Sequence, residues 1–216
     1  MKKASLRTAF LLLAGLPLLL QACASTQLTR RDLESIGTIK VVRYKTPELE
    51  VRTVSGSVLT CLGGCLTGPA GAAIDEDASK KANQGVIFPD YGKLLAQSFM
   101  RLAPEEIPGW PKMVSANDPV ARGYEYKDSA LILFDIDHVW LTAVGGLTIE
   151  GDIIMRDPKG SRILQQHFWY RSIDFGPKKS QQEYLADNRK LLVKEIPLAA
   201  EHTAKELINK QLKQGL

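Results

Sequence analysis

The residues best suited to chemistry begin with Asp135-Ile-Asp137-His138. Paired carboxylates suit general acid–base catalysis, and a histidine beside carboxylates suits a bound metal ion. Three more titratable residues follow on segments that we expect to lie beside this one: Glu150, Asp152 and His167. This pattern raises the hypothesis of a metal-dependent or acid–base hydrolase that uses Asp135 and Asp137.

The alternation of side chains along a strand argues against that hypothesis. On a regular strand Asp135 and Asp137 point to one face and His138 to the other. His138 would then share its face with Ile132, Phe134, Ile136 and Trp140. We therefore predict a packed, hydrogen-bonded His138 and an exposed stripe of aspartates, in a protein that is not an enzyme and holds no metal or other cofactor.

Two other features of the sequence bear on function. No Gly-x-Ser-x-Gly or His-Glu-x-x-His motif occurs, and His202 is expected to be solvated or half-buried. The run His167-Phe-Trp-Tyr170 places Trp169 on one strand face and its two aromatic neighbours on the other. A ring that faces away from the core can mark a binding surface, but we expect it to be covered by a helix or by the loop at 104–128.

Three segments that predict strands would position these residues. Residues 129–142 are rich in β-formers, residues 147–156 alternate cleanly, and residues 162–173 alternate again. Turn signals separate them at Val144-Gly-Gly146 and at Asp157-Pro-Lys-Gly160. We predict an antiparallel three-strand meander over about 129–174.

Two helices are expected to pack on this meander. Asp90 can cap a helix at about 90–103, whose apolar residues recur at helical spacing, and Pro104 should end it. Residues 181–214 also have a helical pattern, with a kink or a junction of two helices at Pro197. Shorter strands are expected from residue 36 to residue 54. The predicted fold class is therefore α+β, with an antiparallel sheet and helices on one of its faces.

The N-terminus has the pattern of a signal peptide. Basic residues precede an 11-residue apolar run, Phe10–Leu20, which is too short to span a bilayer as a helix. The next residues, Leu20-Gln-Ala-Cys23, resemble the lipobox of bacterial lipoproteins, although Gln21 is a looser match. The resemblance implies cleavage between Ala22 and Cys23, with a diacylglyceryl group on the Cys23 sulfur and an acyl group on its nitrogen. The alternative is an incidental cysteine near an ordinary cleavage site or in an uncleaved anchor.

Removal of residues 1–22 changes the charge of the chain. The full sequence has a formal charge of +4, but the signal peptide carries three of its 28 basic residues and none of its 24 acidic ones, which leaves +1. Nucleic-acid binding needs a clustered excess of cations, so no nucleic-acid partner is expected. Residues 23–35 are expected to form a lipidated tether, and residues 36–216 a single periplasmic domain.

An uncharged segment of 22 residues, Thr53–Ile74, interrupts the domain. Its five glycines and Pro69 disfavour a helix, so we expect a loop; a membrane-contacting hairpin or helix and a buried turn remain alternatives. Cys61 and Cys65 lie within it, and an oxidising compartment would allow either a short disulfide or two free thiols.

The order of the elements over residues 36–214 resembles the small periplasmic lipoproteins of the ABC-transport auxiliary type, and more distantly the N-terminal domain of the Tol-system propeller protein. This resemblance implies a non-enzymatic lipoprotein whose periplasmic domain binds another envelope component, protein or lipid. Ala24 in place of aspartate favours the outer over the inner membrane, with the lipid on Cys23 as the membrane contact. The alternatives are an assembly or secretion lipoprotein whose residues 53–74 contact the membrane, and the hydrolase considered above.

Overall fold

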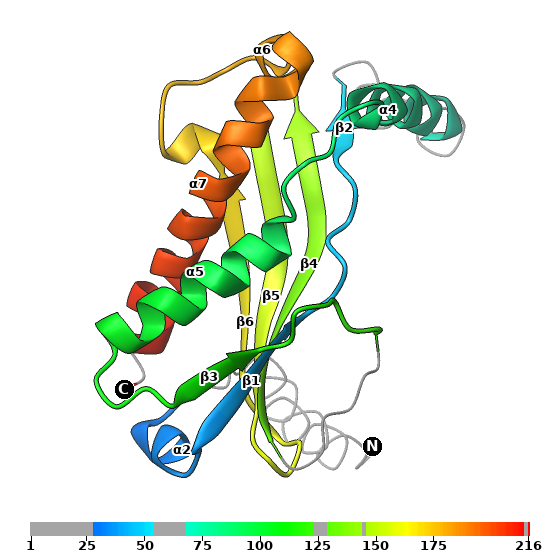
Figure 1. Ribbon diagram of the computed structural model, residues 1–216. Coiled ribbons are helices and arrows are strands. Elements are labelled where there is room, and N and C mark those ends of the chain that lie inside the picture. Colours follow the sequence, from blue (N-terminus) through cyan, green and yellow to red (C-terminus); the bar gives the residue numbers. More distant parts are fainter. Residues whose placement is uncertain (1–27, 54–67, 123–128, 144–145, 214–215) are drawn as a thin grey trace, which may run out of the picture.

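The computed structural model describes residues 28–53, 68–122, 129–143, 146–213 and 216. Figure 1 shows an α+β fold in which helices cover one face of a six-stranded sheet. The strands follow the order β3-β1-β4-β5-β6, and β2 also pairs with β4. The predicted fold class is therefore confirmed.

The meander forms the centre of the sheet. Its strands are β4 (Ala130–Thr142), β5 (Gly146–Arg156) and β6 (Arg162–Arg171), and both pairings are antiparallel. Asp157 organises the second turn, because its carboxylate accepts hydrogen bonds from the backbone N–H groups of Lys159 and Ser161. The predicted meander is present at the predicted place.

The remaining strands extend the sheet in parallel fashion. β1 (Thr38–Arg43) and β2 (Glu50–Arg52) follow one another along the same edge of β4, and β3 (Lys112–Ser115) pairs with β1. The sheet is consequently mixed, with an antiparallel meander on one side and parallel strands on the other.

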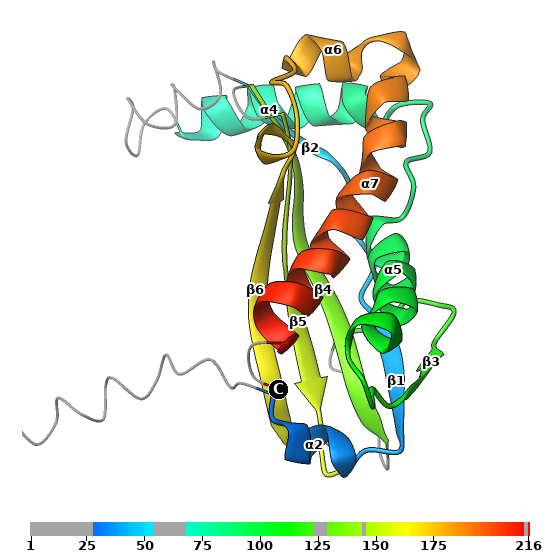
Figure 2. The same ribbon diagram turned by 90° about the vertical axis from the view of Figure 1, so that its left-hand side faces the viewer.

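Helices α5 (Tyr91–Glu106) and α7 (Lys190–Glu206) lie on the same side of the sheet, as Figure 2 shows. Asp90 caps α5, as expected, by accepting a hydrogen bond of 3.1 Å from the Lys93 N–H. The Tyr91 hydroxyl donates to Thr203 Oγ1 over 2.7 Å in the buried contact between the two helices. Pro104 lies in the last turn of α5, and the helix ends two residues later, at Glu106, and not at Pro104 as expected.

The C-terminal helical segment is interrupted, although not at Pro197. A short helix, α6 (Gln181–Leu185), is followed by Asp187–Arg189, whose three residues all have positive φ angles between 49° and 59°. Left-handed residues break the helical path, so the chain changes direction there. Pro197 lies inside α7 on its exposed side, where its ring faces solvent and not the core.

The predicted tether at 23–35 ends earlier than expected. A short helix, α2 (Arg30–Glu34), begins with a capping box in which Thr29 and Asp32 exchange hydrogen bonds. Leu28 is fully buried and Leu33 is 5% exposed, so both belong to the core. Residues 22–27, which include Ala22 and Cys23, lie outside the described residues.

The segment predicted as a loop at 53–74 is helical in its last part. α4 (Gly68–Asn83) starts within it; Pro69 is tolerated there because the first turn of a helix needs no backbone donors. Residues 54–67, with Cys61 and Cys65, lie outside the described residues, so the disulfide stays a prediction. α4 crosses one end of the sheet in Figure 2 and is bound to β2, because Ser79 Oγ accepts from the Val51 N–H over 2.8 Å.

No helix in the described part of the chain is long and apolar enough to cross a membrane.

The helical side of the sheet carries a buried polar network. Glu195, only 7% exposed, accepts hydrogen bonds from the Tyr184 hydroxyl at 2.8 Å and from Lys179 Nζ at 3.3 Å. Burial, followed by the nearby Glu195 carboxylate, raises the pKa of Tyr184 to about 12, so the Tyr184 hydroxyl keeps its proton at neutral pH.

A β-bulge shifts the register of β4 against β5. Ile136 lies opposite Gly151 and His138 opposite Glu150, so Asp137 has no partner on β5. The backbones approach so closely here that a Cβ at Gly151 would lie 2.3 Å from the Asp135 carbonyl oxygen. Only glycine fits at this position of β5.

The contact at Gly151 gives a stability prediction. Gly151→Ala should destabilise the protein by about 1–3 kcal/mol, because the methyl group forces the two strands apart. Gly37→Ala is the matched control, since nothing lies within 4 Å of its Cβ position; its effect should stay within about 0.5 kcal/mol. Urea unfolding of both variants measures this difference, and equal stabilities would contradict the close approach.

Candidate functional site

The bulge in β4 brings to one surface side chains that regular strand alternation would place on opposite faces. Asp135 and His138 both lie on the face of the sheet away from α5 and α7, while Ile136 and Val139 are buried beneath the helices. The prediction that His138 lies on the core side is therefore wrong, because it assumed an unbroken alternation. Gly151 was the missed signal, since an isolated glycine within a strand suggests a bulge.

We call this surface the outer face and define it by two rows of residues across β4, β5 and β6. The first row is Asp135, Asp152 and His167, and the second is His138, Glu150 and Trp169. Asp137, the extra residue of β4 at the bulge, also belongs to the outer face, because its carboxylate lies beside Asp152 and His167. Figure 2 shows α5 and α7 on the opposite side of the sheet. The outer face contains every residue of the titratable set singled out above.

The outer face could hold a divalent cation. One ligand atom each from Asp137, Asp152 and His167 lie within 4.8 Å of one another. Carboxylate oxygens and imidazole nitrogens are suitable ligands for zinc and similar ions. The argument against a metal relied on the divergence of His138 from Asp135 and Asp137, and that premise is wrong because the bulge brings His138 to the same face.

Carboxylates on the outer face repel one another. Partial burial and the charges of Asp137 and Asp152 raise the pKa of Asp135, whereas Arg122 lowers it. Arg122 Nη2 lies 3.3 Å from Asp135 Oδ1, but the arginine side chain is 73% exposed and compensates only in part. The outer face is therefore a place where added positive charge is favourable.

Aromatic rings lie beside these carboxylates. Trp140 continues the β4 part of the outer face; its indole stacks on His138 at 4.5 Å and donates to Glu50 Oε2 over 2.9 Å. The Arg52 guanidinium lies 3.8 Å from the centre of the same indole. Trp140 therefore already has a cation–π partner from its own chain.

Trp169 differs from Trp140 in being 52% exposed. The expectation that a helix or the loop at 104–128 would cover such a ring is wrong for Trp169, although Phe168 and Tyr170 are buried. The Trp169 indole N–H donates to His167 Nε2, and His167 Nδ1 lies 3.2 Å from Asp152 Oδ1. This chain of contacts fixes both rings beside the carboxylates.

The remaining predicted histidine lies elsewhere. His202 is exposed on α7 and packs against Phe175, with ring centres 4.6 Å apart. This agrees with the expected solvated or half-buried side chain. His202 belongs to the helical side of the molecule and not to the outer face.

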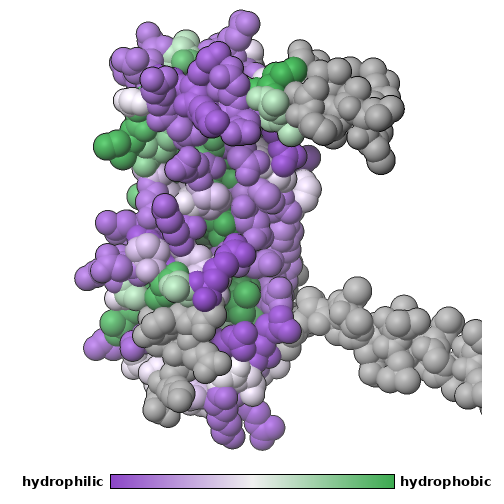
Figure 3. All heavy atoms as spheres, turned by 90° about the vertical axis from the view of Figure 1, so that its right-hand side faces the viewer, coloured by the Kyte–Doolittle hydropathy of each residue, from purple (hydrophilic) through white to green (hydrophobic). Residues whose placement is uncertain are grey.

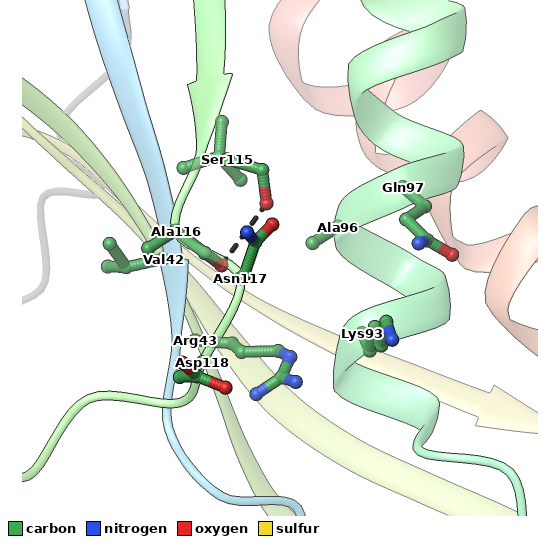
Figure 4. Close-up of a pocket in the computed structure, with 10 residues that line it drawn as sticks. Val42, Arg43, Lys93, Ala96, Gln97, Ser115, Ala116, Asn117 and Asp118 are labelled. Carbon is green, nitrogen blue, oxygen red and sulfur yellow. Dashed lines mark hydrogen bonds between the residues drawn. The ribbon is translucent and has the colours of Figure 1, made fainter.

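A cavity of about 210 Å³ lies between β1, the segment after β3, and α5 (Figure 4). Arg43, 6% exposed, points into this space, and Lys93 and Asp118 also line it. Arg43 Nη2 pairs with Asp90 at 3.1 Å, whereas its Nη1 has no hydrogen-bond partner among the described residues. The negative charges of Asp90 and Asp118 balance the positive charges of Arg43 and Lys93. The cavity therefore has little net attraction for an anion.

Figure 3 shows that hydrophilic residues dominate the described surface on the side where α4 and β2 lie. The outer face combines such polar groups with aromatic rings on a broad sheet surface, which suits binding rather than the enclosure of a substrate. These features define an α+β protein with one helix-covered sheet face and one acidic, aromatic face.

Comparisons with known proteins add little to this description. No protein-family model and no curated protein matches the chain. The crystal structure of XCC0632 from Xanthomonas campestris, of the family DUF330, has a TM-score of 0.44 at 11% identity, covering 89% of this chain and 90% of that one. A structure described as an uncharacterized protein has a TM-score of 0.31 at 12% identity, covering 80% and 90% respectively. Neither likeness bears on function.

The partial burial of Asp135, together with repulsion from Asp137 and Asp152, predicts a pH-dependent gain in stability when this residue is replaced. Because folding raises the pKa of Asp135, its ionised form costs stability above the folded pKa, and this cost vanishes below the unfolded value of 3.8. Asp135→Asn should therefore stabilise the protein at pH 7 by up to about 0.5 kcal/mol, and the gain should disappear near pH 3.

Urea unfolding at the two pH values measures this gain. Asp187→Asn, an exposed site away from the outer face, is the control and should show no such pH dependence. A parent chain more stable than Asp135→Asn at pH 7 would contradict this prediction, because the Arg122 ion pair would then outweigh both burial and repulsion.

Proposed function

We propose that this chain is a lipid-anchored protein of the bacterial cell envelope that binds another envelope component with its outer face and is not an enzyme. The observation that carries the proposal is the half-exposed Trp169 beside Glu150 and Asp152 on an outer face that α5 and α7 leave free. Exposed aromatic rings with polar neighbours are typical of binding surfaces. The lipid on Cys23 would attach the protein to the outer membrane, with its domain in the periplasm.

The position of the first buried residue supports action close to the membrane. Leu28 is fully buried, and only five chain steps separate it from Cys23. Even fully extended, such a segment reaches no more than about 18 Å. A lipidated Cys23 would therefore hold the domain near the membrane surface, where its partner must also be accessible.

The anchor is tested by metabolic labelling with a fatty acid. The parent protein should incorporate the label and fractionate with membranes, and Cys23→Ala should abolish both, because the thioether cannot form. Cys61→Ala and Cys65→Ala are the matched controls and should keep the label. Labelling that persists in Cys23→Ala would overturn the anchor.

The binding role is tested by photo-crosslinking in cells. A benzoylphenylalanine in place of Trp169 should give a discrete crosslinked product, because this side chain faces the proposed partner. The same group in place of Leu198, which is 58% exposed on α7, is the control and should give none. Absence of a product at Trp169, or the same product from both positions, would contradict binding through the outer face.

A further inference from the structure

We infer that the outer face receives a basic protein segment, with a lysine or arginine side chain seated between Asp137 and Asp152 and beside the Trp169 ring. This inference rests on the proposed function, because it names the chemistry of the partner for the same surface. Three observations lead to it: the charge of the outer face, the way the chain places its own arginines there, and the carboxylates that these arginines leave unmatched.

The charge of the outer face and its flank on β2 is strongly negative. Arg52 and Arg122 oppose five carboxylates, Glu50, Asp135, Asp137, Glu150 and Asp152. Arg171, two residues after Trp169 on β6, adds no net charge because it pairs with Asp174. The chain after residue 22 has a formal charge of only +1, so this negative field is local. It attracts cationic segments and repels phosphate groups, whether of nucleic acids or of anionic lipids.

The chain's own arginines show how a cation is accommodated on this surface. Arg52 lies over the Trp140 ring at 3.8 Å, and its Nη2 is 3.7 Å from Glu50 Oε2. Arg122 pairs with Asp135 at 3.3 Å and lies over the Tyr44 ring at 5.6 Å. In both cases one guanidinium contacts a carboxylate and an aromatic ring together, which is a favourable arrangement for arginine.

The same pair of groups is present around Trp169, but the cations that line a cavity with this ring, Arg171 and Lys210, pair with Asp174 and Glu206 instead. Among the described residues, Glu150 and Asp152 form ion pairs with His167, at 3.2 Å each, and with no lysine or arginine. No basic side chain of the described residues is recorded within 4.0 Å of Asp137. Trp169 remains half exposed beside them. A partner's lysine or arginine would complete here the contacts that Arg52 and Arg122 make elsewhere on the surface.

Binding of a hexalysine peptide to the full lipidated chain in an uncharged detergent tests this inference, with hexaglutamate as the negative peptide. Calorimetry at low salt should detect hexalysine only. Asp137→Asn combined with Asp152→Asn should weaken its affinity at least tenfold, and Trp169→Ala, which removes an exposed ring, should weaken it about threefold.

A second double variant distinguishes the effect of the charges on the outer face from the effect of the protein's net charge. Glu105→Gln combined with Asp187→Asn removes the same charge from exposed positions outside the outer face and should leave the affinity within twofold. Equal losses in the two double variants would overturn the inference, as would binding of hexaglutamate. Near-ultraviolet circular dichroism checks that each variant is folded, and Trp169→Ala remains informative if the aspartate variant is not.

Zinc alone is the remaining arm of the experiment. Binding of zinc that requires His167 and excludes hexalysine would show a metal site instead of a docking surface, and would overturn the inference. If hexalysine fails to bind while position 169 still gives a crosslink in cells, the inference of a basic partner is wrong and the proposed function stands. If hexalysine binds but position 169 gives no crosslink in cells, the proposed function is contradicted, and with it the basic segment as its partner.

Discussion

The close contact between the Gly151 backbone and the Asp135 carbonyl oxygen is the constraint on which the outer face depends. Because β5 has no side chain at this position, β4 can accommodate one extra residue, Asp137, opposite it. The extra residue reverses the alternation of β4 for the rest of the strand. His138 and Trp140 consequently join Asp135 on the surface, and Val139 and Leu141 enter the core.

The two faces of the sheet differ in the forces that act on their side chains. On the helical side, burial of apolar residues from β4, β5, α5 and α7 supplies stability, and the buried Glu195 is satisfied by Lys179 and Tyr184. On the outer face, carboxylates that repel one another are kept at the surface, where water limits the cost. This division lets the outer face retain an unfavourable charge pattern that a cationic partner can relieve.

The proposed lipid anchor at Cys23 would be consistent with such a role. The core begins at Leu28, so a lipidated Cys23 would leave little freedom between bilayer and domain. A protein held in this way meets partners that are themselves near the membrane, and its local concentration there favours even modest affinities. The proposed contact therefore needs few strong interactions to be effective.

The sequence by itself determined the meander, the capped helix that starts at Tyr91, the α+β class and the lipobox pattern, because apolar periodicity, turn residues and caps are local signals. It did not place the helix break, since the positive φ angles at 187–189 involve ordinary residues, whereas Pro197 looked decisive. The outer face was decided only by tertiary structure. One inserted residue reverses every later side chain on a strand, and whether a strand bulges depends on the backbone of its neighbour, here at Gly151.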